Sequence, residues 1–232
     1  MQKNQLIVYD TIELDGDPKI TRAYIYNYLG IRPGALYNES VVKRISQRLA
    51  DVAFLTELRA PEVVFEADKA KIRLFLQNRK TSRFDLLIGI LPNNEISGRV
   101  LFTGEANLEL QNAFGLAEDI KLNWRKLQTG TQQLDIALKY PYLFSLPVGI
   151  DGSFSLYKRD TLFLDIDYEF GLQYLFAGRH YIRAFFHNKA TNVLNVDTAY
   201  IIRNRTLPQY NDVRNSLFGL EYYLERLDYR FN

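Results

Sequence analysis

Residues 102–114 read FTGEANLELQNAF, and this stretch decides the fold of the 232-residue chain. Apolar or small residues take every second position from Phe102 to Leu110, and polar or charged residues take the positions between them. That period of two is typical of a β-strand with one apolar and one polar face. The strand exceeds the usual length of about five or six residues. A barrel strand that crosses a bilayer needs about 9–11 tilted residues with aromatic side chains near the interfaces. We therefore interpret this stretch, which Phe102 and Phe114 bracket, as a transmembrane strand.

The same alternation recurs along residues 81–232, with little helical periodicity between the repeats. It predicts about eight antiparallel strands, at 84–91, 102–114, 119–125, 133–140, 148–157, 162–173, 181–187 and 218–224. A soluble β-sandwich shows the same alternation, but the length of the strands and their aromatic ends favour a barrel.

The connections between these strands form two sets when they are assigned to alternate sides of the sheet. One set is uniformly short, and the other contains the longest link, at 188–216. Outer-membrane barrels have short periplasmic turns and longer outer loops. The pattern therefore predicts that the residues before the first strand lie on the periplasmic side.

Composition excludes several classes of protein. Hydrophobic residues make up 47% and charged residues 24% of the chain, which argues against disorder. The absence of cysteine excludes disulfides and thiolate sites. Lys and Arg number 29 against 27 Asp and Glu, so no strong field attracts nucleic acid. The longest apolar run, Leu86 to Leu91, is far below the roughly 18 residues of a spanning helix.

Residues 1–80 differ in character and predict a small α+β domain. Strand-like patterns occur at 6–14, 62–66 and 72–77. Thr21 has the properties of an N-cap for a helix that ends at Gly30, and Asn38 has those of an N-cap for a second helix that ends near residue 54. One apolar stripe runs along this second helix, formed by Val42, Ile45, Leu49 and Val52.

The motifs LGIRPG at 29–34 and YNE at 37–39, within this order of elements, resemble a polypeptide-transport-associated (POTRA) domain. A POTRA domain followed directly by barrel strands is the plan of the BamA and TamA outer-membrane assembly superfamily. The segment YPYLF at 140–144 is similar to a periplasmic turn found early in such barrels. The resemblance implies a β-α-α-β-β POTRA domain at 1–80, followed by an antiparallel all-β transmembrane barrel portion at 81–232.

Members of that superfamily usually carry several POTRA domains and a sixteen-stranded barrel, and their Arg-Gly-Phe/Tyr loop motif is absent here. We therefore expect a fragment that contains the last POTRA domain and the first half of a barrel. An eight-stranded barrel that closes on itself is the structural alternative.

The resemblance also implies a non-enzymatic role in assembling and inserting outer-membrane proteins. Client strands are expected to add to exposed sheet edges, the mode called β-augmentation. The candidate docking residues lie on one strand of the first domain and on the first barrel strand: Val63, Val64, Phe65, Phe84, Leu86, Ile88 and Ile90. The expected partners are unfolded outer-membrane proteins, outer-membrane lipid and accessory periplasmic lipoproteins, without nucleic acid. The expected location is the outer membrane of a Gram-negative bacterium.

Two other functions stay open from the sequence: a two-partner secretion-type transporter, and a soluble ligand-binding β-sandwich carrying an α+β module. Asp165, Asp167 and Glu169 share one strand face, which any polar face produces, so we interpret them as lumen-facing structural residues. His180 and His187 lack a third ligand signature. No catalytic, metal-binding or cofactor-binding residue is expected.

Overall fold

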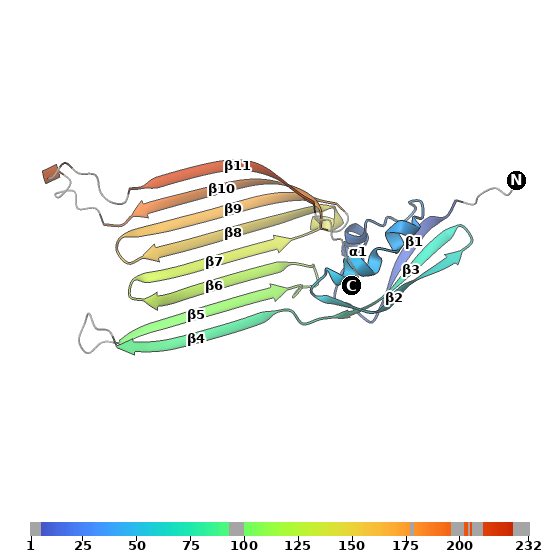
Figure 1. Cartoon of the computed structure of the whole chain (residues 1–232), viewed down its shortest axis with the longest axis horizontal. Helices are drawn as coiled ribbons and strands as arrows, with labels where there is room; N and C mark the ends of the chain where they lie inside the picture. Colours follow the sequence, from blue (N-terminus) through green and yellow to red (C-terminus); the bar gives the residue numbers. More distant parts are fainter. Residues whose placement is uncertain are drawn as a thin grey trace, which may run out of the picture.

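The computed structural model describes residues 6–92, 100–176, 179–195, 202–203, 205 and 211–224. Two sheets make up the described part, one of three strands and one of eight. Figure 1 shows the small sheet and its helices at one end of the strands of the large sheet. The residues from 6 to 78 are called the N-terminal module below.

The N-terminal module has the element order strand, helices, strand, strand. It consists of β1 (Val8–Asp15), α1 (Arg22–Leu29), α2 (Glu39–Val42), α3 (Ile45–Ala50), β2 (Leu55–Glu66) and β3 (Lys69–Asn78). The sheet order is β1-β3-β2, with β1 parallel and β2 antiparallel to β3. Its core joins the helices to the sheet through fully buried side chains, among them Ile12, Ile25, Leu29, Ile45 and Leu74.

The predicted ends of the first helix are confirmed. The hydroxyl of Thr21 accepts a hydrogen bond from the backbone N–H of Tyr24 at 3.2 Å. Gly30 ends the helix in the left-handed region, with φ of 68°. A residue with a Cβ adopts that conformation only at a cost, so glycine suits this position.

The prediction of one continuous second helix is wrong, because the chain breaks it into α2 and α3. The backbone N–H of Arg44 donates to the carbonyl of Val41, three residues earlier, instead of continuing the four-residue spacing of an α-helix. Arg44 itself has φ of −95° and ψ of 0°, outside the helical region. The predicted apolar stripe nevertheless faces the core, since Ile45, Leu49 and Val52 are all buried.

The strand predicted at 6–14 is confirmed as β1, with a register shift between Tyr9 and Ile12. One strand boundary in the module differs from the prediction. β2 begins at Leu55, well before the expected start at residue 62. Register shifts on both sides of Arg59 and a proline at position 61 break the alternation, which hid this half of the strand.

The eight predicted strands of the second part are confirmed as one antiparallel sheet. They are β4 (Arg83–Pro92), β5 (Val100–Gln111), β6 (Asp119–Gln128), β7 (Thr131–Tyr140), β8 (Val148–Arg159), β9 (Phe163–Leu175), β10 (Tyr181–Val193) and β11 (Val213–Tyr223). Each strand pairs with its neighbours in sequence. Strand lengths of 10 to 13 residues suit a tilted bilayer crossing. The link predicted at 188–216 is shorter, because β10 runs on to Val193 and β11 begins at Val213.

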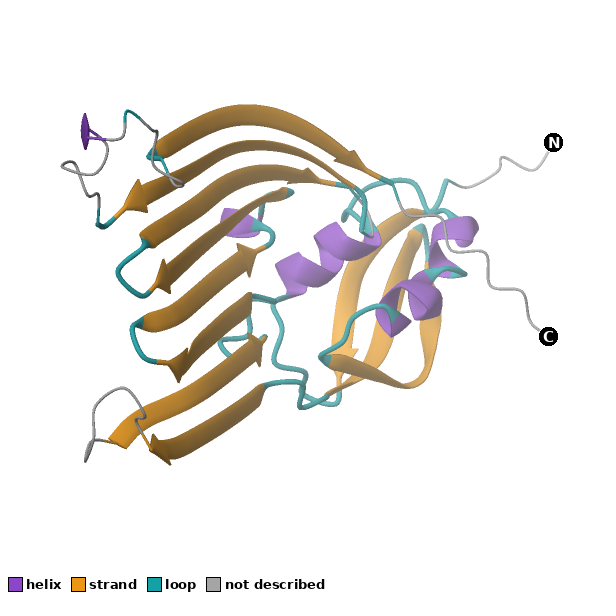
Figure 2. Cartoon of the chain, turned by 60° about the vertical axis from the view of Figure 1, so that its left-hand side comes forward, coloured by secondary structure: helices purple, strands orange, loops and turns teal. Residues whose placement is uncertain are grey.

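The large sheet is a single open layer (Figure 2). Its strands do not form two packed sheets, so the predicted sandwich alternative is wrong. Among the described strands, β4 pairs only with β5, and β11 pairs only with β10. The β4–β11 pairing that a self-closed eight-stranded barrel requires is therefore absent from this part of the chain.

Short turns of the large sheet contact the N-terminal module. The amide of Asn112, after β5, donates to the carbonyl of Lys19 at 2.7 Å. In the turn between β7 and β8, which includes the short helix Leu143–Ser145, the carbonyl of Ser145 accepts from Asn27 at 2.9 Å. The connections after β5 and after β7 thus lie on the side of the module, whereas the two shortest links, 129–130 and 160–162, lie at the other end of the strands. No helix within the described ranges has the length and apolar character needed to span a membrane.

Candidate functional site: open sheet edges and a polar face

One face of the large sheet carries apolar residues on every strand. Asn188 of β10 and Ser216 of β11 also lie on this face and are hydrogen-bonded to each other at 2.6 Å. Register lines across the sheet keep apolar residues together; one such line passes through Leu108, Leu122, Ile136 and Phe154. Many of these side chains are exposed, including Phe170 at 63% and Phe218 at 82%. An exposed apolar surface that continues across eight strands is suited to contact with lipid. This surface is called the apolar face below.

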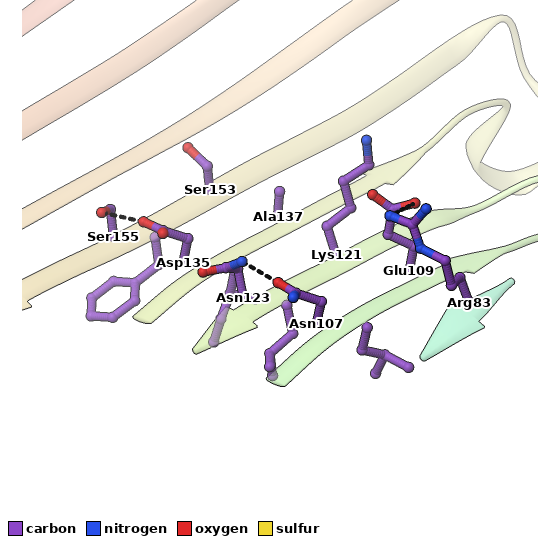
Figure 3. Close-up of a pocket in the computed structure, with 13 residues that line it drawn as sticks. Arg83, Asn107, Glu109, Lys121, Asn123, Asp135, Ala137, Ser153 and Ser155 are labelled. Carbon is purple, nitrogen blue, oxygen red and sulfur yellow. Dashed lines mark hydrogen bonds and ion pairs between the residues drawn. The ribbon is translucent and has the colours of Figure 1, made fainter. Parts of the chain in front are cut away.

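The opposite face, called the polar face below, carries hydrogen bonds and ion pairs between strands. Arg125 pairs with Glu105 at 3.0 Å, and Ser155 donates to Asp135 at 2.5 Å. Figure 3 shows polar side chains from β4 to β8 lining one shallow pocket there, with Asn107 and Asn123 bonded across it. A polar surface opposite an apolar one matches the lumen of a membrane barrel.

Arg183 is the centre of the most buried charge cluster on the polar face. Its Nε lies 3.0 Å from Oδ1 of Asp151, and its guanidinium also bonds Glu169. Oε2 of Glu221 is 3.5 Å from Nη1. The Arg183 side chain is only 10% exposed, so these ion pairs are screened less than surface pairs. They join β8, β9 and β11 to β10.

Gly171 makes room for this cluster. A Cβ at position 171 would lie 2.5 Å from Nε of Arg183 and 2.5 Å from Oδ1 of Asp151. The cluster was not predicted from the sequence. An isolated glycine inside a strand pattern, which marks a close approach, was the available signal.

The acidic residues singled out in the sequence do lie on the polar face. Asp167 contacts Nε2 of His187 at 2.9 Å, and Glu169 bonds Arg183, so both have structural partners. Among the described residues, no group of three or more His, Asp and Glu side chains is arranged to hold a metal ion.

The first set of predicted docking residues lies on an edge strand. Val63, Val64 and Phe65 belong to β2, whose only partner in the small sheet is β3. Phe65 is 52% exposed, and its ring packs edge-on against Tyr37 with centroids 5.3 Å apart. The bulges around Arg59 distort the same edge upstream, and such irregularities oppose pairing with another strand. The regular part of the edge is therefore its end, from Glu62 to Glu66.

The second set lies on an edge of the large sheet, apart from the first set. Phe84, Leu86, Ile88 and Ile90 all lie on the apolar face of β4 and are at least 56% exposed. Within the described residues, one side of β4 has no strand partner. Leu87 and Leu91 on the polar side of the same strand are also exposed, so β4 is apolar on both faces from Leu86 to Leu91, whereas Arg83 and Asp85 keep the start of its polar side charged.

The sequence analysis missed the corresponding edge at the other margin of the sheet. β11 leaves one side unpaired within the described chain, and Phe218 and Leu220 on its apolar face are each 82% exposed. The alternation found β11 as a strand, but only its place in the sheet order makes it an edge.

Comparison with known proteins supports the fold. No protein-family model and no curated protein sequence matches the chain. A structure of BamA from Haemophilus ducreyi lacking POTRA domains 1–3 is 14% identical over 92% of this chain, with a TM-score of 0.50. CdiB from Acinetobacter baumannii is 14% identical over 95% of the chain, and CdiB from Escherichia coli 10% over 94%, with TM-scores of 0.54 and 0.55. The chain spans less than half of each structure, from 42% to 44%. Its fold is therefore that of part of these longer chains.

Proposed function

We propose that this chain is part of an outer-membrane protein of the BamA and TamA type that assembles and inserts other barrel proteins. In this proposal residues 1–80 are a POTRA domain in the periplasm of a Gram-negative bacterium, and residues 81–232 are a barrel portion in the outer membrane. Support comes from the apolar face, the polar face opposite it, and the contact of the N-terminal module with the turns after β5 and after β7.

The observation that carries the proposal is that one side of β4 has no strand partner among the described residues. Its backbone donors and acceptors form a template for an extended chain, and backbone pairing is the basis of β-augmentation. Phe84, Leu86, Ile88 and Ile90 already lie on the apolar face, so a client strand added there continues that face. No covalent step is involved, because the client gains its structure by pairing.

The end of β2 is proposed as an earlier docking point for the same clients. Val63 and Val64 are half-buried against β3, and Phe65 is exposed beside Tyr37. An unfolded client reaching the N-terminal module is proposed to pair here before it meets β4. Outer-membrane lipid and accessory periplasmic lipoproteins complete the set of proposed partners.

The test is an insertion assay. The chain is folded into lipid vesicles, and a urea-unfolded, cysteine-free eight-stranded outer-membrane barrel protein serves as the client. The expected result is faster appearance of the heat-modifiable folded client than in empty vesicles. A photoreactive residue at Ile88 is expected to crosslink the client during insertion, whereas one at Ile136, on central β7, is not. Equal rates with and without the chain would contradict the proposal.

A two-partner secretion-type transporter is the second candidate, since it combines the same kind of domain with a barrel. The specific observation in its favour is that the two CdiB structures match this chain at least as well as the BamA structure does. A secretion transporter exports a dedicated substrate, so it is expected to leave insertion of the unrelated test client unchanged.

A further inference from the structure

The charged residues on the apolar face all have the same sign. Within the described strands, they are Lys126 of β6, Lys158 of β8 and Arg214 of β11. Each is placed on this face by its strand partner, in turn Gly104, Leu164 and Ala190. No aspartate or glutamate of the described strands lies on the apolar face. The charge on this face is therefore entirely positive.

These basic residues also lie at one end of the sheet, remote from the N-terminal module. β6 and β8 begin after turns that contact the module and run away from it (Figure 1). Lys158 comes ten positions after Val148, the first residue of β8. At about 3.3 Å per residue and a tilt of about 40°, this separation spans about 25 Å, the height of the apolar band of an outer-membrane barrel. Lys158 is therefore expected at the boundary between hydrocarbon and headgroups.

Lys126 and Lys158 lie on either side of Gln132 of β7. Lys158 pairs directly with Gln132, and Lys126 meets it from the other side, at a register shift in β6. The backbones of β6 and β8 are about 10 Å apart, because neighbouring strands are separated by about 4.8 Å. The flexible stems of two lysines span that distance, so both ammonium groups can contact one anion. The side-chain amide of Gln132 is a further donor between them.

The basic side chains on the apolar face have no partner within the described residues. None of Lys126, Lys158 and Arg214 forms an ion pair or a side-chain hydrogen bond there. The polar face differs, because its charges have both signs and many are paired, as Arg125 is with Glu105. An anion for the basic residues must therefore come from outside the described chain. At the boundary of a bilayer, the phosphate of a lipid headgroup is such an anion.

We propose that Lys126, Gln132 and Lys158 bind the phosphate of an anionic lipid headgroup, and that Arg214 extends the same basic rim. The acyl chains of that lipid then lie along the apolar face beside Trp124. A basic residue near a membrane surface favours an acidic lipid by about fivefold. This proposal rests on the placement of the barrel portion in the outer membrane under the proposed function. It requires neither a client nor the open side of β4.

Trp124 is a reporter for this site. It is the only tryptophan of the chain, and it lies two residues before Lys126 on the same face. A Cβ at position 104, the partner of Lys126, would lie 2.9 Å from its ring. Phospholipids with brominated acyl chains quench tryptophan fluorescence by contact. Quenching of Trp124 therefore measures which lipid lies beside Lys126.

The chain is folded into vesicles of equimolar phosphatidylcholine and phosphatidylglycerol, in which one or the other lipid is brominated. The composition and charge of the bilayer are then the same in both measurements. Brominated phosphatidylglycerol is expected to occupy the site at least about fivefold more strongly than brominated phosphatidylcholine at low salt. The preference is expected to fall as salt rises, because exposed charges are screened.

The double variant Lys126→Gln/Lys158→Gln is expected to lose this preference, and Lys126→Arg/Lys158→Arg is expected to keep it. The matched control is Lys139→Gln/Lys189→Gln, which removes the same charge from the polar face. Its preference is expected to equal that of the natural chain. If the first double variant does not fold, each of its single substitutions is expected to lower the preference.

Equal quenching by the two brominated lipids in the natural chain would overturn the proposal, since the lysines would then extend into water without selecting a lipid. A preference that survives the loss of both lysines would also overturn it. Quenching by neither lipid would contradict the membrane placement, and with it the proposed function. A retained preference without any effect on client insertion would contradict the proposed function alone.

Discussion

Tyr142, in the turn between β7 and β8, packs edge-on against Tyr24 of α1, with ring centroids 5.3 Å apart and planes at 78°. Both residues are buried, at 7% exposure each, although Tyr24 belongs to the N-terminal module and Tyr142 to a turn of the large sheet. Tyr24 also stacks on Tyr28, one helical turn further on. The core of the N-terminal module therefore includes a residue of the large sheet, which ties the two parts together.

Replacing Tyr142 by alanine is expected to loosen the module from the sheet. Removal of a buried aromatic ring costs about 3 kcal/mol, and here the lost contact joins α1 to the turn. The measurement is limited proteolysis in micelles, with cleavage followed between residues 79 and 82. Faster cleavage is expected in Tyr142→Ala. Phe144→Ala, in the same turn, is the control, because Phe144 is 83% exposed and its removal is expected to change little.

The same contact is expected to weaken at high pH. Burial raises the pKa of Tyr24 well above its usual value, with Tyr28 and Tyr142 adding to the effect and Arg179 opposing it. Burial likewise raises the pKa of Tyr142. A raised folded-state pKa means that the stabilising contribution is complete below the unfolded value of about 10 and is lost as pH rises through the folded value.

Cleavage between residues 79 and 82 is therefore expected to accelerate as pH rises above about 10, the ordinary tyrosine value. The double variant Tyr24→Phe/Tyr142→Phe keeps both rings and removes both ionisable hydroxyls. Its cleavage rate is expected to depend less on pH. An unchanged pH dependence in the double variant would show that other groups control the contact.

The strands of the large sheet were predictable because their signal is local. A strand with one apolar and one polar face alternates with a period of two residues, as in 102–114. The break between α2 and α3 was not predictable, because the apolar stripe from Val42 to Val52 continues through it. Likewise, the bulges and the proline in β2 remove the alternation on which the prediction depends.

The Arg183 cluster could not be predicted from local sequence patterns, for a different reason. Asp151, Glu169 and Glu221 come from three other strands, and which of them meet Arg183 depends on the register of each pair. A shift of two residues preserves the alternation but changes every such contact. The predicted docking residues of β2 and β4 could be placed on strands from the sequence, but the open side of each strand follows only from the sheet order.

The N-terminal module is expected to fold without the large sheet when residues 1–80 are produced alone. Nearly all of its buried core comes from residues 9–76, with Ala117 and Tyr142 as the outside contributions. Cooperative thermal unfolding by circular dichroism is the measurement. Leu49→Ala in this domain is expected to cost about 3 kcal/mol, because Leu49 is 2% exposed. Unfolding without cooperativity would place the domain boundary elsewhere.

Arg183→Met is expected to destabilise the folded sheet by about 3–5 kcal/mol. Methionine keeps much of the side-chain volume but leaves Asp151, Glu169 and Glu221 without their shared cation. The measurement is the temperature at which the folded gel mobility is lost in micelles. Arg125→Met is the control. Arg125 is 46% exposed, and within the described residues its ion-pair partner is Glu105. An exposed pair of that kind contributes at most about 1 kcal/mol. Glu169→Gln added to Arg183→Met is expected to recover part of the loss, because it removes one uncompensated charge. If the two arginine substitutions lowered that temperature equally, burial of the Arg183 ion pairs would make no additional contribution to the stability of the sheet.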